Sequence, residues 1–236
     1  MKKSILTKPA FRYIFEIFII VFSVTISFYI QDILNEREKI ELKNESLRGV
    51  LADLNEDLEG FTDASEYLIN RIKLGDEFLS GQVSNKSINN ILLTYGFLGI
   101  ESNYKSLVST GAIEYINNKS LVKELTSYYE IDYSLLNDIS GQYKHFYYGM
   151  FEFMLANYPT ESMNKLILTD NKIDFTNKPL ELQYDKQSLL KLYKDSEFRS
   201  RVYSLKRIVI VYIEFYRQAF DRNKKLSSLI ENELNN

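Results

Sequence analysis

Cysteine and tryptophan are absent from the 236 residues, and histidine occurs once. The lack of cysteine excludes disulfides, thiolate nucleophiles, cysteine-based zinc sites and iron–sulfur clusters. Three prolines and nine glycines are too few for a Pro/Gly-rich disordered chain or for a β protein with many turns. The net charge of −3 gives no electrostatic basis for nucleic-acid binding. The length suits one folded domain with an appendage.

The charge is distributed unevenly along the chain. Residues 1–12 carry four bases and no acid, a net charge of +4. Residues 31–60 carry nine acids against four bases, a net charge of −5. Residues 186–236 carry eleven bases against six acids, a net charge of +5. The last two segments therefore have opposite charge, which favours their pairing and their register.

An apolar run from 13 to 30 holds Glu16 as its only charge. As a helix, residues 13–34 would extend roughly 33 Å, which is enough to cross a bilayer. Tyr13 and Tyr29 lie near the two ends, where amphipathic rings favour the membrane interface. We therefore predict a transmembrane helix over residues 13–34, with the lipid bilayer as the first partner of the chain.

This run has two other interpretations. A cleaved signal peptide would use residues 1–12 as its basic region, but bulky Phe28, Tyr29 and Ile30 stand where a cleavage site needs small residues. A core helix of a soluble protein would show a polar face, whereas nearly every face of residues 17–30 is apolar or small. An uncleaved anchor is favoured over both.

The flanking charges predict the orientation of the span. The basic tail, residues 1–12, is expected in the cytoplasm, and the large C-terminal part is expected to cross the membrane. The predicted location is the inner (cytoplasmic) membrane of a bacterium, with one span and a periplasmic or extracellular domain. Glu16 is a candidate functional carboxylate within the membrane. The favoured interpretation is a pair with Arg12, one helical turn earlier.

A 4-3 spacing of apolar residues continues beyond the span, and it predicts a long heptad helix over residues 35–79. Arg37 and Asn44 occupy seam positions near the membrane, where a polar residue fixes register. Lys43, Asp53 and Asp57 are expected on its solvated face. The pattern suits a coiled coil with a second copy or one helix of a bundle equally well. The seam consists of Ile33, Arg37, Ile40, Asn44, Leu47, Leu51, Leu54, Leu58, Phe61, Ser65, Leu68 and Ile72.

The C-terminal residues repeat this spacing in a predicted helix over residues 186–234, with Asp185 as its N-cap. We predict an all-α fold in which this helix pairs antiparallel with residues 35–79, while residues 80–185 form a small helical head between them. The second seam consists of Phe198, Val202, Leu205, Val209, Tyr212, Tyr216, Ala219, Asn223, Leu226 and Ile230.

Tyrosine is abundant, with eighteen residues, and six of them crowd one predicted helix of the head. They could line a ligand groove or a protein interface. The favoured alternative is a core whose hydroxyls reach water or backbone at its edge. These six residues are Tyr128, Tyr129, Tyr133, Tyr143, Tyr147 and Tyr148.

Two blocks of the sequence resemble a family of bacterial single-span membrane proteins common in Bacteroidota, known as a domain of unknown function. The first is EIFIIVFSVTISFYIQDILNEREKIE (16–41), although Leu34 stands where the family usually has tryptophan. The second is YKSLVSTGAIEYINNKSLVKELTSYYEIDY (104–133). The resemblance covers about a quarter of the chain. It implies a membrane anchor and a helical extracytoplasmic domain, and it implies no activity.

The sequence contains no nucleotide-binding glycine loop, nucleophile elbow, HExxH or EF-hand loop. His145 has no second histidine or cysteine to form a metal site, so we expect no cofactor and no enzymatic activity. The predicted function is a membrane-anchored scaffold or interaction module whose partner is a second copy or another membrane protein. The alternative is an extracytoplasmic ligand sensor that acts through a partner protein. A hydrolase built from Asp, Glu, Tyr and Ser is the third possibility.

Overall fold

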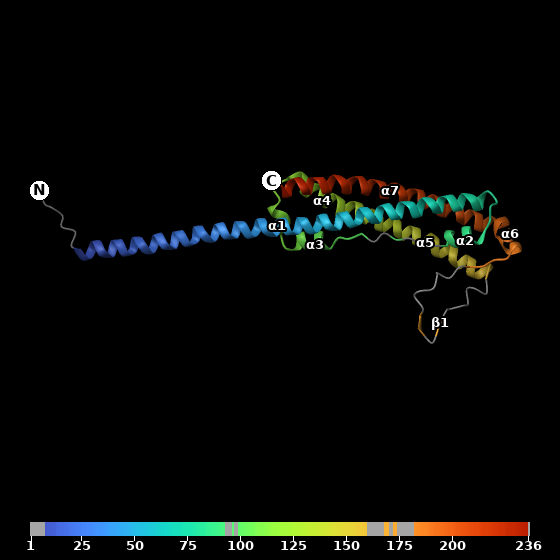
Figure 1. Cartoon of the computed structure of the whole chain (residues 1–236), viewed down its shortest axis with the longest axis horizontal. Coiled ribbons are helices and arrows are strands. Elements are labelled where there is room, and N and C mark those ends of the chain that lie inside the picture. The colour runs from blue at the N-terminus through green and yellow to red at the C-terminus, as the bar shows by residue number, and fades with distance from the viewer. Residues whose placement is uncertain are drawn as a thin grey trace.

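One helix, α1 (Lys8–Leu79), sets the length of the molecule (Figure 1). The computed structural model describes residues 8–92, 96, 99–159, 168–169, 172–173 and 182–235. The 72 residues of α1 rise roughly 108 Å. Pro9 lies in the first turn, where its missing N–H is harmless, and no later proline interrupts the helix. The chain leaves α1 at Gly81, whose φ of 96° favours glycine.

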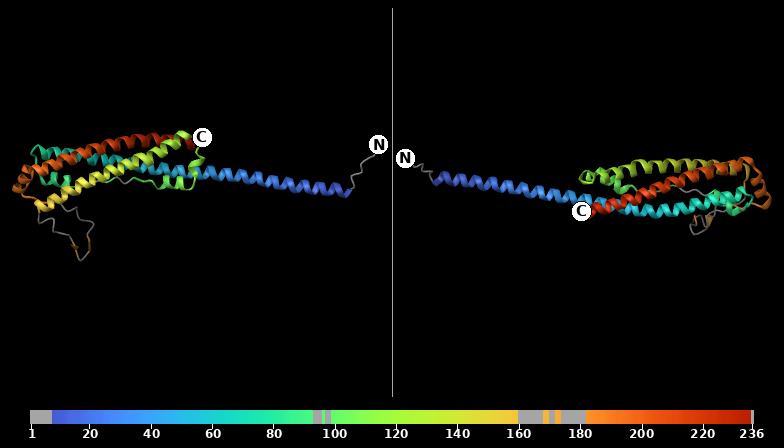
Figure 2. Two further views of the ribbon diagram at one scale, coloured as in Figure 1. Left: turned by 180° about the vertical axis from the view of Figure 1, so that it is seen from behind. Right: turned by 90° about the horizontal axis from the view of Figure 1, so that it is seen from above.

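The N-terminal half of α1 projects alone from the rest of the protein (Figures 1 and 2). Every side chain from 12 to 38 is exposed. Within the described part of the chain, α1 is the helix that is long and apolar enough to cross a membrane, by length and composition. The predicted single span therefore has a matching element.

The other elements gather around the C-terminal half of α1. Helices α2 (Asn85–Ile91) and α3 (Ser102–Ser109) and the 3₁₀ turn η1 (Ala112–Tyr115) pack on α1. Helix α4 (Lys119–Ser127), the π-helical turn η2 (Tyr128–Asp132) and α5 (Tyr133–Asn157) follow without a break. Strands β1 (Leu168–Thr169) and β2 (Lys172–Ile173) pair antiparallel. Helices α6 (Lys186–Lys194) and α7 (Ser196–Leu234) end the chain.

Helices α1 and α7 lie side by side in both figures. Their contacts run in opposite chain order. Lys43 Nζ lies 3.0 Å from Glu233 Oε1, and Lys206 pairs with Asp76 further along. Between these two ion pairs, the Phe61 and Tyr216 rings meet edge to face at 5.2 Å. The C-terminus of α7 therefore lies at the end of the bundle from which the free part of α1 emerges (Figure 1).

Every residue of the second seam is buried in α7, and Ser227 is buried beside them. The buried face of α1 differs from its predicted seam. Leu47, Leu54, Phe61 and Leu68 are buried as expected, but Ile33 and Ile40 are exposed. A second row of residues on α1, next to the seam, is also buried, because α2 and α3 cover that side of the helix. This row comprises Lys43, Val50, Asp57, Ala64, Arg71 and Phe78.

The predicted helix over residues 186–234 is interrupted at Asp195. The carboxylate oxygen Oδ1 of Asp195 accepts hydrogen bonds from Glu197 N at 2.8 Å and Phe198 N at 3.0 Å, so it caps α7. Its ψ of 113° is extended, which ends α6. An aspartate that bonds the following backbone competes with helix continuation, and this explains the break.

The predicted small head is also not a separate body in the described residues. Helix α5 lies along α7, as Figure 2 shows from two sides. Arg201 Nη1 donates to Gly149 O at 3.0 Å, and Tyr143 meets Tyr212 at 5.9 Å between ring centroids. A 25-residue helix with its own apolar stripe buries more surface along α7 than it would as a cap on the end.

Candidate functional site

Four charged side chains of α1 are buried against the elements around it: Lys43, Asp53, Asp57 and Arg71. Burying a charge is unfavourable unless it is paired and hydrogen-bonded. Lys43 has its partner in Glu233, and both side chains are nearly buried. The two aspartates and Arg71 have no oppositely charged partner among the described residues. These three residues are therefore the starting point for a candidate site.

Asp53 holds the chain that enters α3. Its carboxylate accepts the backbone N–H of Asn103 at 3.0 Å and the side-chain amide of Asn103 at 2.7 Å. Asn103 in turn fills the space beside Gly49, where an added Cβ would lie 2.6 Å from Asn103 Oδ1. A glycine is therefore required at 49 for α3 to approach this closely.

Asp57 lies one helical turn after Asp53. Its Oδ1 accepts the N–H of Ile100 at 3.1 Å, and its Oδ2 is hydrogen-bonded by the Tyr133 hydroxyl. The Tyr133 oxygen also lies 3.1 Å from Ile100 O, but the hydroxyl has a single proton to donate. A protonated Asp57 would donate to Tyr133 Oη and free that proton for Ile100 O. Burial, assisted by the neighbouring Asp53 charge, raises the pKa of Asp57 to about 6.

A cluster of stacked tyrosines surrounds this carboxylate. Tyr128 and Tyr129 lie on the π-helical turn η2 and Tyr133 is the first residue of α5; all three are buried, with ring centroids 5.0 to 5.2 Å apart. Tyr104 of α3 stacks on Tyr129 with centroids 4.2 Å apart. Burial raises the pKa of the Tyr128, Tyr129 and Tyr133 hydroxyls, so they are neutral hydrogen-bond groups at physiological pH.

Asn223 connects α7 to the tyrosine cluster through hydrogen bonds. Its side-chain amide is fully buried and donates to Leu54 O at 3.0 Å and to Tyr128 Oη at 3.1 Å. One seam position of α7 therefore bonds both α1 and η2. The polar cluster joins α1, the start of α3, η2 and α7 in one network.

The six predicted tyrosines do not line one groove. Tyr128, Tyr129 and Tyr133 form the stacked cluster just described. Tyr143 is buried two to three turns along α5, beside the Arg71 guanidinium at 5.3 Å and against Tyr212. Tyr147 is half-buried and Tyr148 is exposed. Four of the six are thus core residues, which was the favoured alternative at the sequence level, and Tyr148 is the one that a partner could reach directly.

Arg71 is the most unusual of the buried charges, with 5% of its surface exposed. Its Nη2 donates to Ile91 O at 2.6 Å, and the guanidinium faces the rings of Tyr67 and Tyr143. Its Nε–H has no acceptor among the described residues. Desolvation lowers the pKa of Arg71, but an arginine stays protonated in a protein, so a positive charge is held inside the bundle.

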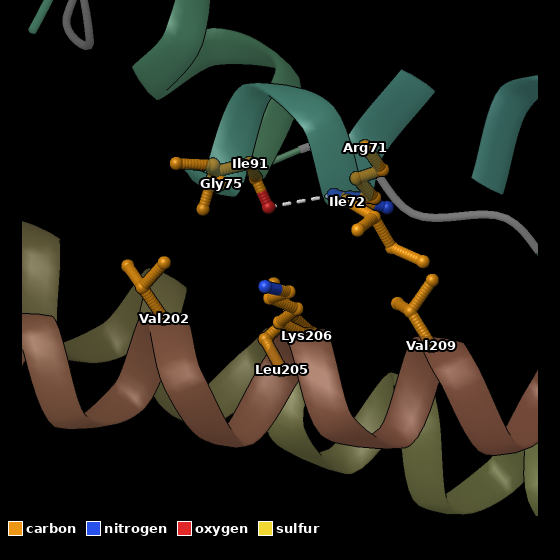
Figure 3. Close-up of a pocket in the computed structure, with 8 residues that line it drawn as sticks. All are labelled: Arg71, Ile72, Gly75, Ile91, Val202, Leu205, Lys206 and Val209. Carbon is orange, nitrogen blue, oxygen red and sulfur yellow. Dashed lines mark hydrogen bonds between the residues drawn. The ribbon is translucent and has the colours of Figure 1, made fainter. Parts of the chain in front are cut away.

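A small cavity adjoins Arg71 between α1 and α7 (Figure 3). The volume of the cavity that the centre of a water molecule can occupy is about 10 Å³. A cavity of this size holds about one water-sized particle. Arg71, Ile72 and Gly75 of α1 and Ile91 of α2 lie on one side. Val202, Leu205, Lys206 and Val209 of α7 lie on the other.

The predicted residues at the membrane end have clear positions. Glu16 pairs with Arg12 at 2.9 Å, as the favoured interpretation required. Arg37 is exposed on the free part of α1. Asn44 is half-buried at the base of the bundle, and its Oδ1 has no hydrogen-bond partner in the part of the chain that the structure describes. His145 is exposed, and the described residues contain no group of three or more metal-ligating side chains.

The buried charges were not identified from the sequence. Lys43, Asp53 and Asp57 were assigned to a solvated face, and the structure shows that this assignment is wrong. The available signal was the spacing of residues 43, 50, 57, 64, 71 and 78, a heptad row that alternates charged and apolar residues. Charged and apolar residues also alternate at the edge between the buried and the exposed face of a helix. The row by itself therefore does not indicate buried charges.

No family model, curated protein sequence or solved structure matches this chain.

Proposed function

We propose that this protein is a membrane-anchored helical scaffold or interaction module, without catalytic activity. The observation that carries the proposal is the continuity of α1, which runs as one helix from an apolar, fully exposed N-terminal half into a buried bundle. An exposed apolar helix of this length is suited to lipid. A bundle fixed to it without a hinge would be held at a set distance from the bilayer.

Two hydroxyls within the proposed span are hydrogen-bonded to the helix itself, which supports its placement in lipid. The Thr25 hydroxyl donates to Val21 O and the Ser27 hydroxyl to Ser23 O, both at 2.8 Å. Such bonds to the preceding turn make isolated hydroxyls tolerable in hydrocarbon. Glu16 with Arg12 lies near the N-terminal end, where charged side chains reach the headgroups.

In the proposed orientation the basic tail, residues 1–12, is cytoplasmic and the bundle is periplasmic or extracellular. Helices α1 and α7 then form an antiparallel pair in which α1 leaves the bilayer and α7 returns toward it. Residues 35–42 of α1, which we call the neck, separate the span from the bundle by roughly 12 Å. Opposite charge on the two helices favours this pairing over alternatives.

The partner we propose is a second copy of the chain or another membrane protein. Above residue 43, the seam of α1 is occupied by the chain's own helices, so a partner helix would meet the span or the neck. Ile40 in the neck is 52% exposed. Helix α7 adds exposed Tyr203, Ile210 and Val211 on its outer face. Exposed apolar side chains that gather into a patch mark interaction surfaces, and we propose the outer face of α7 as such a surface.

The alternative function, an extracytoplasmic ligand sensor, would need a binding pocket in the bundle. The tyrosine cluster is closely stacked rather than hollow, with ring centroids 4.2 to 5.2 Å apart. The interaction module is therefore the function that the geometry supports better.

Two measurements test the proposal. After carbonate washing of membranes, we expect the full chain to stay in the pellet, and in intact cells we expect external protease to reach the bundle only after the outer membrane is opened. Recovery in the soluble fraction would refute the anchor. Protection of the bundle in spheroplasts would refute the orientation.

Self-association is tested with single cysteines, each of which is unique because the chain has none of its own. Ile40→Cys in the neck should form a disulfide-linked dimer in membranes if the partner is a second copy. Lys73→Cys, on the solvent face of α1 within the bundle, is the matched control and should not. An unlinked Ile40→Cys chain that also purifies without a partner would count against an interaction module.

A further inference from the structure

The charge around the Arg71 cavity is unbalanced. Arg71 lines the cavity from α1 and Lys206 lines it from α7, as Figure 3 shows. Lys206 pairs with Asp76 at the surface. No carboxylate among the described residues pairs with Arg71. The surroundings of the cavity therefore hold one positive charge more than the acids can compensate.

The partners that Arg71 does have are neutral. The Ile91 carbonyl, the Tyr67 hydroxyl at 3.5 Å from Nη1 and the faces of the Tyr67 and Tyr143 rings attract the guanidinium, but none of them carries a negative charge. Removing an ion from water costs several kcal/mol unless an opposite charge and hydrogen bonds replace the solvent. The unpartnered Nε–H of Arg71 shows that the hydrogen bonds are also incomplete.

We propose that the cavity between α1 and α7 is a binding site for one small inorganic anion of about the size of chloride, held by Arg71 with Lys206 as a second cation. The cavity admits about one particle of this size. An ordered water could accept a hydrogen bond there, but it would leave the charge uncompensated. The aliphatic walls of Ile72, Val202, Leu205 and Val209 exclude a large hydrated anion.

Binding of an anion here would stabilise the contact between α1 and α7, because the site exists only when the two helices are packed. A ligand that binds the folded state alone raises the free energy of unfolding in a saturable way. This inference is independent of the membrane function proposed above, since it depends only on the bundle.

The test is thermal unfolding of the full chain in non-ionic detergent while sodium chloride replaces sodium gluconate at constant ionic strength. Gluconate is too large for the cavity, and constant ionic strength keeps the screening of surface charges the same. We expect the midpoint of unfolding to rise with chloride and to saturate. Lys206→Met should raise the apparent chloride dissociation constant about tenfold, and Arg71→Met should abolish the dependence.

Lys225→Met is the matched control. Lys225 also lies on α7 and pairs with an acid, Glu124, but it is at the surface far from the cavity. Its chloride dependence should equal that of the unsubstituted chain, and loss of the dependence in this variant would refute the site. If Arg71→Met does not fold, bromide soaked into crystals of the unsubstituted chain decides the question. An anomalous peak beside Arg71 supports the proposal, whereas its absence, or no chloride dependence in the folded chain, overturns it in favour of a bound water.

Discussion

The Asp57→Asn substitution should stabilise the bundle at neutral pH. In the native structure the Asp57 carboxylate and Ile100 O both approach the Tyr133 hydroxyl, which has one proton. An asparagine keeps the acceptor for Ile100 N–H and adds an N–H that can donate to Tyr133 Oη. It therefore imitates protonated Asp57 without its charge.

The magnitude follows from the pKa. Asp57 has a pKa of about 6 in the folded protein, against an ordinary value of 3.8 for an aspartate. The folded state therefore binds the proton more tightly than the unfolded state does. A shift of this size corresponds to about 3 kcal/mol of destabilisation by the charged form. The free energy of unfolding should fall as pH rises from about 4 to 6, and the contribution should stay constant above that range.

The assay is urea unfolding of the full chain in non-ionic detergent, followed by far-UV circular dichroism at several pH values. At pH 7.5 we expect Asp57→Asn to be more stable than the unsubstituted chain by about 3 kcal/mol, with a difference that shrinks toward zero near pH 4. Asp63→Asn, on the exposed face of α1, is the control and should change stability by less than about 0.5 kcal/mol.

Two results would refute the reasoning. If Asp57→Asn destabilised the bundle at pH 7.5, the carboxylate would be a favourable acceptor rather than a strained charge. If the difference between the two chains did not change between pH 4 and pH 7.5, the proton on Asp57 would not be coupled to folding.

Three further substitutions test separate contacts by urea unfolding of the same chain. Gly49→Ala should destabilise the bundle by about 1–3 kcal/mol because its Cβ would collide with Asn103, whereas Gly60→Ala meets nothing and should stabilise it by about 0.5–1 kcal/mol. Equal effects of the two would contradict the close approach at 49. Asn223→Leu should cost about 1–3 kcal/mol because two buried groups lose their donor, and a neutral outcome would mean that they find another. Asp195→Ala should cost about 1 kcal/mol through the lost cap of α7, and a more stable variant would show that the break between α6 and α7 is not maintained by this cap.

Much of the fold follows from simple patterns in the sequence. Apolar spacing located every buried seam position of α7, because that helix is covered by α1 on one side and α5 on the other. Asp185 accepts a backbone N–H group at the start of α6, as predicted for a cap. The long apolar run marked the free half of α1 without any help from packing.

The same patterns could not predict the candidate site. Its residues are polar, and the groups that they bind are distant in the sequence. Asp57 is buried because Ile100 N–H and the Tyr133 hydroxyl reach it, and neither contact is visible in a local pattern. The position of α5 along α7 depended on a choice between two ways of covering the same apolar stripe. Spacing alone cannot make that choice, because it records which residues avoid water and not what covers them.

The alternating row of α1 has a mechanical consequence. Lys43, Asp57 and Arg71 each meet different neighbours, and the small or apolar side chains of Val50, Ala64 and Phe78 stand between them. A slide of α1 by one heptad would set Val50 opposite Glu233 and leave buried charges facing aliphatic walls. The rod therefore cannot work as a piston through its own bundle. A displacement of the free N-terminal half of α1 would therefore tilt or rotate the whole bundle, because α1 cannot slide through it.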